Sequence, residues 1–216
     1  MRSACQGTLT AARAALADGF AVNLSGGYHH AKPDDGEGFC VFADVSYALK
    51  SLWQDNTLAD DALVLYIDLD AHMGNGVAHC FLEDPRVRLF DMYNNEIYPY
   101  DPEAAQRIDC NLPLKIGCEE DLYLGILADN LPSYVDQLTQ EKPIALAVYN
   151  AGTDPYEGDE LGGMKISQDG ILRRDVFVFQ TLQSRNIPTL FVPSGGYSKL
   201  SYQLIATSVD AMLSGS

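Results

Sequence analysis

One stretch near the middle of the chain, Ala62–His72, limits the fold most strongly. Its first six residues are almost entirely apolar, which is typical of a strand covered on both faces in a parallel sheet. Because strand side chains alternate, Asp68, Asp70 and His72 are expected to project together from its carboxyl end, where open α/β folds place their chemistry. The stretch predicts metal ligands; alternatively, these polar residues cap the loop that begins at Gly74.

The rest of the chain repeats this pattern of apolar runs that end in polar or glycine-rich residues. Further strands are expected at 20–24, 86–92, 108–112, 143–149 and 189–193. Segments with helical spacing separate them, at about 7–18, 42–53, 76–82, 119–138, 169–185 and 199–212. This alternation predicts a single α/β domain over residues 1–216, with three layers around a mostly parallel central sheet.

The charge balance excludes some partners. The chain carries 14 Lys and Arg against 30 Asp and Glu, a formal net charge of −16. Nucleic-acid grooves and anionic membrane surfaces need clustered positive charge, so neither partner is expected. The charge would favour a cationic substrate, although a surface adapted for solubility is the simpler explanation. No segment approaches the length of a membrane span, and the five dispersed cysteines are typical of reduced thiols in a cytoplasmic protein.

The polar strand ends together contain the parts of a hydrolytic metal site. Two carboxylates and one imidazole would leave room for water at the metal, as in catalytic zinc sites. Two adjacent histidines could supply the base for that water and the acid for the leaving group, and a tyrosine hydroxyl could stabilise an oxyanion. The residues concerned are Asp70, His72 and Asp154 for the metal, with His29, His30 and Tyr197 beside it. This combination predicts hydrolysis of an amide.

Six motifs resemble, in order and spacing, those of the metal-dependent histone deacetylase family. They are Gly26–His30, Gly38–Cys40, Asp68–Gly76, Asn150–Asp154, Glu157–Asp159 and Ser194–Tyr197. The forms Tyr-Asn-Ala-Gly-Thr-Asp and Ser-Gly-Gly-Tyr look most like the class IV branch. The resemblance extends from about Gly7 to Ser208. It implies the arginase/deacetylase fold, Zn²⁺ held by Asp70, His72 and Asp154, and hydrolysis of acylated lysine or a similar acylamine.

The resemblance also implies roles for single residues. His29 and His30 would be the general acid/base pair, and Asp68 would orient the first of them. Asn75 lies where many relatives have an aspartate beside the second histidine, and an amide raises the pKa of that histidine less than a carboxylate would. Tyr197 would stabilise the oxyanion.

Two further groups of residues follow from the same resemblance. The substrate channel would be lined by Gly27, Phe39, Tyr98, Leu161, Gly195 and Gly196. A structural monovalent cation, K⁺, would be bound by the Asp68 carboxylate and by backbone oxygens of Asp68, Asp70, His72, Asp91 and Met92.

The chain departs from the family in front of the histidine pair. Only 28 residues precede His29, whereas relatives carry a longer segment that supplies strands and one wall of the channel. The sequence is therefore expected to be either a fragment or a shortened enzyme. A shortened enzyme would expose a sheet edge, which predicts a homo-oligomer.

Two other functions stay open at this point. A deacetylase of polyamines or other small acylamines would suit the acidic composition. A non-catalytic zinc-binding remnant could act as an interaction module. A binuclear manganese hydrolase is disfavoured because no further Asp and His residues surround the central motif, and long fatty acyl groups remain possible beside acetyl.

Overall fold

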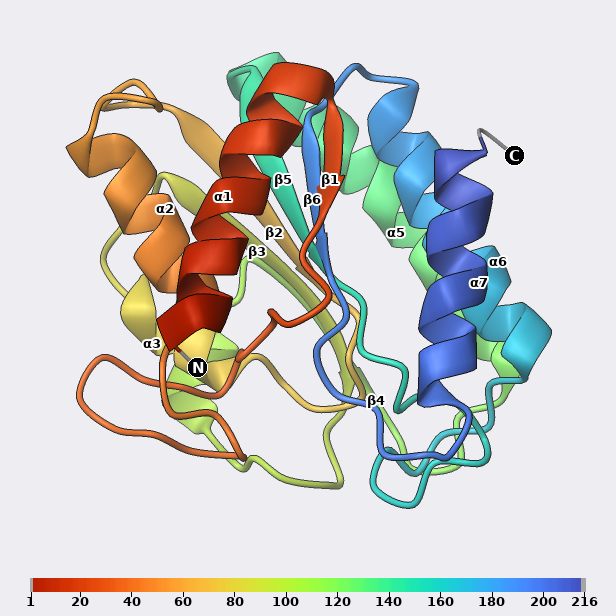
Figure 1. Ribbon diagram of the computed structural model, residues 1–216. Coiled ribbons are helices and arrows are strands. Elements are labelled where there is room, and N and C mark those ends of the chain that lie inside the picture. The colour runs from red at the N-terminus through yellow and green to blue at the C-terminus, as the bar shows by residue number, and fades with distance from the viewer. Residues whose placement is uncertain (1, 215–216) are drawn as a thin grey trace.

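A six-stranded sheet between two layers of helices forms the centre of the computed structural model, which describes residues 2–214 (Figure 1). The strands are β1 (Phe20–Val22), β2 (Leu63–Asp68), β3 (Val87–Asn94), β4 (Cys110–Leu114), β5 (Ile144–Asn150) and β6 (Thr189–Val192). The helices are α1 (Arg2–Asp18), α2 (Asp44–Gln54), α3 (Asn75–Cys80), α4 (Pro102–Arg107), α5 (Glu120–Glu141), α6 (Gln168–Gln183) and α7 (Ser201–Leu213).

The order of the strands creates a crevice at the carboxyl end of β2. The sheet has the order β1-β6-β5-β2-β3-β4, and every pairing is parallel. From β2 the chain runs outward to β3 and β4, then returns to place β5 on the other side of β2. Open α/β folds bind their ligands outside the carboxyl ends of the strands, at the point where the strand order reverses in this way. The topology therefore favours a site between the loops that follow β2 and β5.

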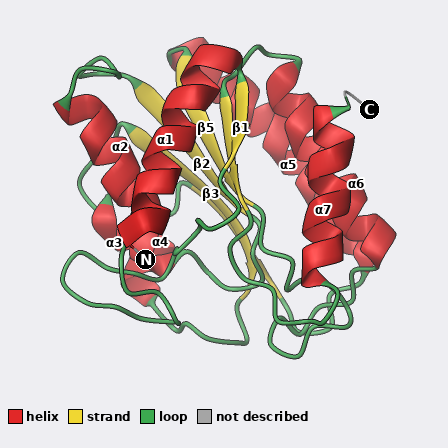
Figure 2. Ribbon diagram, viewed as in Figure 1, coloured by secondary structure: helices red, strands yellow, loops and turns green. Residues whose placement is uncertain are grey.

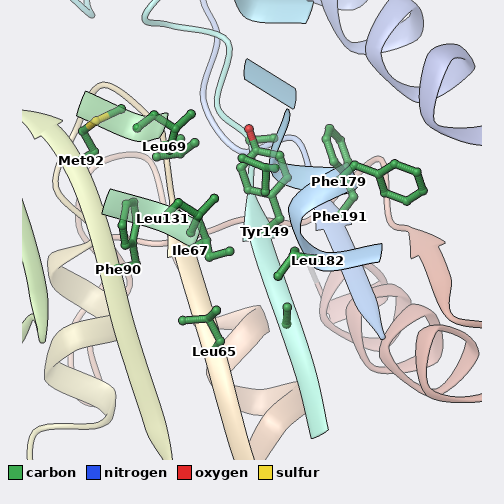
Figure 3. Close-up of a cluster of buried hydrophobic side chains, with 14 of the residues drawn as sticks. Leu65, Ile67, Leu69, Phe90, Met92, Leu131, Tyr149, Phe179, Leu182 and Phe191 are labelled. Atoms are coloured by element: carbon green, nitrogen blue, oxygen red, sulfur yellow. The ribbon is translucent and has the colours of Figure 1, made fainter. Parts of the chain in front are cut away.

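Both faces of β2 are buried, which explains its continuous apolar sequence. Leu65 and Ile67 pack in the core under α5, α6 and α7, whereas Val64 and Tyr66 pack in the core under α1–α4. The first of these cores is drawn in Figure 3, and the helices flank the sheet on opposite sides in Figure 2. The predicted three-layer α/β architecture with a parallel sheet is confirmed.

Several element boundaries differ from those expected. Helix α1 begins at Arg2 instead of near Gly7, and β1 ends at Val22 instead of Leu24. Helix α4 was not expected because its six residues are too few to show a helical period. Its start is nevertheless encoded locally, since the Asp101 carboxylate accepts a hydrogen bond from the Ala104 amide at 3.1 Å.

The expectation that Asp70 and His72 continue the β2 strand is wrong. The strand ends at Asp68, and two successive side-chain turns follow it. The Asp68 carboxylate accepts the Asp70 amide at 3.2 Å, and the Asp70 carboxylate accepts the His72 amide at 2.9 Å. Aspartate side chains compete in this way with the ladder of a sheet. The side chains of Asp70 and His72 are therefore placed by a turn and not by strand alternation.

The edge formed by β1 lies beside an apolar surface of α7. Strand β1 pairs with β6 on one side, and within residues 2–214 no strand pairs with its other side. Leu24, Tyr202 and Leu213 are all more than 60% exposed near this edge. Homo-oligomerisation through such a surface stays a prediction. Across the same described range, no helix combines the length and the hydrophobicity needed to traverse a bilayer.

Candidate active site

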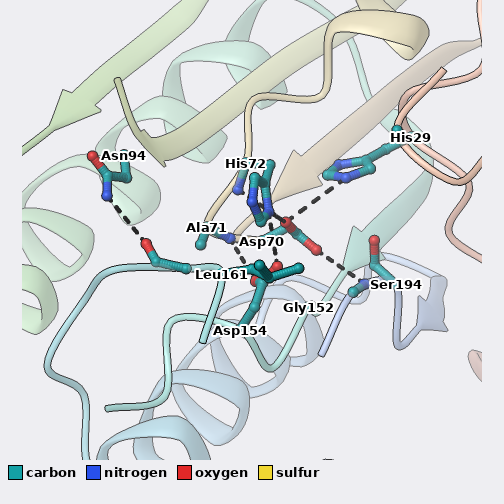
Figure 4. A network of polar contacts seen from close by, with 12 residues as sticks. His29, Asp70, Ala71, His72, Asn94, Gly152, Asp154, Leu161 and Ser194 are labelled. Atoms are coloured by element: carbon teal, nitrogen blue, oxygen red, sulfur yellow. Dashed lines mark hydrogen bonds and ion pairs between the residues drawn. The ribbon is translucent and has the colours of Figure 1, made fainter. Parts of the chain in front are cut away.

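Asp70, His72 and Asp154 converge at the carboxyl ends of β2 and β5. Their candidate ligand atoms all lie within 4.8 Å of one another, and all three residues are buried. His72 Nδ1 lies 3.0 Å from Asp70 Oδ1 and 2.9 Å from Asp154 Oδ2 (Figure 4). The three residues predicted as metal ligands are thus brought together from two loops 82 residues apart.

The chemistry of this donor set fits a divalent cation. A ring nitrogen carries at most one hydrogen, so His72 Nδ1 cannot fully satisfy both carboxylates that face it. Burial, together with the charge of Asp70, raises the pKa of Asp154 to about 7, since two carboxylates crowd one dry site. A cation bound between His72 Nδ1, Asp70 Oδ1 and Asp154 Oδ2 would accept a lone pair from all three atoms at once. Two carboxylates and one imidazole suit Zn²⁺, and they would also accept Fe²⁺ or Mn²⁺.

Backbone amides fix the outer oxygens of both carboxylates. The Ala71 amide donates to Asp154 Oδ1 at 2.8 Å, which ties the β5 loop to the β2 loop. The Gly195 amide donates to Asp70 Oδ2 at 3.0 Å from the loop after β6. Gly152 must stay a glycine, because a Cβ there would overlap the Asp70 carboxylate. Residues of three loops therefore fix the positions of the Asp70 and Asp154 carboxylates relative to each other.

Arg174 supports the same loops from beneath, a role that the sequence analysis missed. This fully buried guanidinium donates to the carbonyl oxygens of Leu69 at 3.0 Å and Gly152 at 2.7 Å. Its charge is balanced by Asp175, with Nη2 2.8 Å from Oδ1. The sequence does contain one sign of this role, because Arg174 and Asp175 are adjacent on the otherwise apolar face of α6, and buried charges require partners.

The first histidine of the pair is held by a carboxylate. His29 Nδ1 lies 2.9 Å from Asp68 Oδ2, as the resemblance implied. The Tyr66 hydroxyl donates to the same oxygen at 2.9 Å, and the Asn150 amide donates to the other at 2.8 Å. Burial by itself lowers the pKa of His29, but the charges of Asp68 and Asp70 outweigh it and raise the pKa to about 9. Tyr66 and Asn150 went unassigned because neither spacing nor composition identifies a supporting hydrogen bond.

The second histidine is held by an amide. His30 Nδ1 lies 2.7 Å from Asn75 Oδ1, and its ring centroid lies 4.0 Å from that of His29. Burial, and then the positive charge of His29, lower the pKa of His30 to about 3. At neutral pH the pair therefore contains one protonated and one neutral imidazole.

A cavity of about 280 Å³ opens beside the histidine pair. Among the residues proposed for the channel, it is lined by Gly27, Phe39, Gly195 and Gly196, and Tyr197 also contributes to its wall. Gly27 has a φ of +101°, and a Cβ there would lie 2.7 Å from the Asn150 side chain. Close packing of backbone at the cavity floor therefore requires glycine at this position.

The two other channel candidates lie outside the lining of this cavity. The Tyr98 ring packs edge-on against His30, with centroids 5.0 Å apart, so it contacts the histidine pair from outside this cavity. Leu161 is exposed on the loop after Asp154 and is held there by a 2.9 Å bond from its amide to Asp159 Oδ1.

Tyr197 stands at the rim of the cavity and is positioned by Asp159. The Asp159 carboxylate accepts the amides of Tyr197 at 2.6 Å and Ser198 at 2.9 Å. Burial, followed by the charges of Asp70 and Asp154, raises the pKa of the Tyr197 phenol. The hydroxyl therefore stays protonated at neutral pH and can donate a hydrogen bond. Asp159 belongs to the motif Glu157–Asp159, but no role could be assigned to it from the residues alone.

The residues predicted for a monovalent cation lie on adjacent strands. Asp68 on β2 is in register with Asp91 on β3, and Met92 follows it. Asp91 is buried; its Oδ2 accepts the Gly74 amide at 2.8 Å, and its Oδ1 has no hydrogen-bond partner among the described residues. Burial and the charge of Asp68 raise the pKa of Asp91 well above its usual range. This cluster is rich in oxygen ligands, as a hard cation requires.

Comparison with known proteins places these features in a family. A family model described as "Histone deacetylase domain" matches residues 1–213. Histone deacetylase 2 of Arabidopsis thaliana is 42% identical over 204 residues, which cover 94% of this chain and 51% of that protein. The chain therefore spans about half the length of this relative.

Two solved structures share the fold. An acetylpolyamine aminohydrolase from Burkholderia pseudomallei matches with a TM-score of 0.79 and 24% identity, over 97% of this chain and 60% of that one. An HDAC homologue complexed with SAHA matches with a TM-score of 0.80 and 23% identity, over 98% and 56%. The length of the family match and the identity to the plant protein show that this chain belongs to the histone deacetylase family.

Proposed function

We propose that the chain is a Zn²⁺-dependent deacylase of the class IV type that hydrolyses the amide of acylated lysine side chains. The observation that carries this proposal is the buried group of Asp70, His72 and Asp154 directly beside a histidine pair, with His29 Nε2 3.7 Å from Asp70 Oδ1. Metal ligands that served only structure would not need an acid and a base within reach.

The surrounding residues have separate roles in this mechanism. Zn²⁺, when bound by these three residues, would polarise the acyl carbonyl and acidify a water molecule. His30, kept neutral by its burial and by the neighbouring positive charge of His29, accepts the proton of the attacking water and then delivers it to the leaving amine nitrogen. His29, charged through Asp68, provides a fixed positive charge near the developing oxyanion. The Tyr197 hydroxyl donates a hydrogen bond to that oxyanion.

The remaining residues shape and stabilise the site. Gly27, Phe39, Gly195 and Gly196 form the wall along which the acylated side chain enters. Tyr98, which packs on the His30 ring, and Leu161, on the exposed loop after Asp154, would contact the substrate outside this wall. K⁺ bound near Asp68, Asp91 and Met92 would offset the buried negative charge beneath the histidine pair. Asp91 Oδ1, which no hydrogen-bond donor contacts within residues 2–214, supports such a cation.

Hydrolysis of paired lysine peptides, acetylated and long-chain acylated, tests the proposal. The full chain restored with Zn²⁺ should release the acyl group, and Asp154→Ala should abolish both zinc retention and turnover. The preferred chain length then reports the depth of the pocket. Full activity in metal-free protein, or stoichiometric zinc without turnover of any acyl substrate, would refute the proposal; the second result would favour an interaction module.

One alternative within the same chemistry is favoured by the net charge of −16, which suits a polycationic substrate. An N-acetylpolyamine assayed beside the acetyl-lysine peptide separates the two substrates. A higher kcat/KM for the polyamine, falling steeply with added salt, would assign the small acylamine as substrate.

A further inference from the structure

We propose that Glu37 is a positioning residue that fixes the tautomer of His30 by holding the Asn75 side chain in one orientation. The meaning of that tautomer for catalysis rests on the proposed deacylase function. The tautomer itself is a property of the protein without substrate.

The orientation of the Asn75 amide follows from its two partners. Asn75 is completely buried between His30 Nδ1, 2.7 Å from its Oδ1, and Glu37 Oε2, 3.3 Å from its Nδ2. An ionised carboxylate can only accept hydrogen bonds, so Glu37 must face the NH₂ end of the amide. The amide oxygen then faces His30, and His30 Nδ1 must carry the hydrogen. This leaves the lone pair on Nε2, the nitrogen that has to accept a proton.

Glu37 is itself held in place by charge. Lys32 Nζ lies 2.9 Å from Glu37 Oε2 and 3.1 Å from Asp101 Oδ2. Asp101 in turn lies 2.8 Å from His79 Nε2 at the outer end of the same network. Four polar side chains, from Asn75 to Asp101, therefore connect His30 to the N-terminus of α4, and Glu37 is the anionic link next to the amide.

The loop that carries Glu37 packs tightly on His30. The Cys40 amide donates to the Glu37 carbonyl oxygen at 2.7 Å, which closes a turn. Gly38 within this turn has a φ of +51°, and a Cβ there would overlap the His30 ring. The backbone of this turn therefore holds the Glu37 carboxylate within hydrogen-bonding distance of the Asn75 amide.

An amide at position 75 makes this anchor necessary. A carboxylate would offer His30 an acceptor oxygen in either orientation, whereas a rotated Asn75 would offer its NH₂ group instead. The proton of a neutral His30 would then move to Nε2, and the lone pair needed there would be lost. Glu37 thus fixes the orientation of the Asn75 amide. An aspartate at position 75 would not need such a partner, because either of its oxygens could accept the hydrogen bond from His30 Nδ1.

Nitrogen-15 NMR of the histidine rings tests this proposal on the full chain, with and without Zn²⁺. The chain has four histidines, which makes the ring signals assignable. We expect the Nδ1–H form of His30 alone in the parent protein, and a mixture with the Nε2–H form in Glu37→Ala. Glu37→Gln should keep the parent pattern, because Lys32 holds its amide oxygen toward Asn75. Asp34→Asn, on the exposed side of the same loop, is the matched charge control and should also keep it.

A rescue variant separates orientation from general damage. Asn75→Asp combined with Glu37→Ala should restore the single Nδ1–H form. In turnover assays, Glu37→Ala should lower kcat at least roughly tenfold with little change in KM, a part of the 10²–10⁴-fold that a general base supplies. A single unchanged Nδ1–H form in Glu37→Ala would overturn the proposal. A parent protein with this form but without turnover would refute the deacylase function and leave the role of Glu37 intact.

Discussion

Replacement of Arg174 by Met should destabilise the protein more than any change at a neighbouring surface arginine. The guanidinium is fully buried and lies 2.8 Å from Asp175, so its removal leaves a buried carboxylate without its counter-charge. Breaking a buried pair in this way costs about 3–5 kcal/mol. Hydroxyl donors from Tyr149 at 2.5 Å and Ser208 at 2.6 Å remain on Asp175, which favours the lower end of that range.

The matched control is Arg173→Met, one residue away. Arg173 is largely exposed and pairs with Glu120 at 3.1 Å, and exposed pairs of this kind contribute about 0–1 kcal/mol. Urea denaturation at pH 7 in the presence of a chelator measures both variants without a contribution from metal binding. Thermal denaturation of the same samples should show a loss of roughly 6–12 °C in Tm for Arg174→Met, from the lower end of the range for a broken buried pair at about 2–4 °C per kcal/mol.

The same substitution should weaken zinc binding. Arg174 holds the carbonyl oxygens of Leu69 and Gly152, and these residues lie just before the two acidic ligands. Competition with a chromogenic chelator measures the zinc affinity of folded protein in each variant. Equal losses of stability in Arg174→Met and Arg173→Met, or an unchanged zinc affinity, would refute this reasoning.

Three further predictions address the site, the pH dependence and the assembly. Gly152→Ala should abolish zinc binding, because the added Cβ would displace the Asp70 carboxylate. The control Gly125→Ala, whose Cβ would meet open space on α5, should bind zinc normally and gain up to about 1 kcal/mol of stability. Normal zinc affinity in Gly152→Ala would contradict the geometry. Although burial raises the pKa of Asp101, its bonds from Ala104, His79 and Lys32 hold it below the usual value, so its contribution to stability is present above about pH 3.9 and is lost as the pH falls further. Urea midpoints between pH 7 and pH 2.5 should therefore fall less for Asp101→Asn than for the parent chain, and parallel curves would exclude this contribution. Sedimentation velocity should detect a dimer or larger species if the β1 edge and α7 self-associate, and a monomer at all concentrations would reject that prediction.

Much of the fold could be predicted from local patterns. The buried run of β2 requires cover on both faces, and the alternation of strands and helices leaves few arrangements other than a layered parallel sheet. The motif residues Asp70, His72 and Asp154 were identifiable because two carboxylates and one imidazole are the ligand types of a catalytic metal, and they follow buried strands at the edge where open α/β folds place their chemistry.

Other features depend on contacts that no local pattern encodes. The orienting hydrogen bond from Asn150 to Asp68, and the guanidinium of Arg174 beneath two loops, join residues up to 105 positions apart. Their partners become neighbours only once β5 and α6 are placed beside β2. The short helix α4 had no readable period for a similar reason, since six residues complete fewer than two turns.

The sequence by itself determined which side chains could carry the chemistry and at which edge of the sheet they gather, because period and residue type are local properties. Only the tertiary structure decided how those side chains are aimed. Asp70 and His72 are placed by carboxylate turns after the strand has ended, and the Asn75 amide is turned by a glutamate 38 residues away. Orientation at a site is set by the sum of its hydrogen-bond partners, and those partners are assembled by the fold.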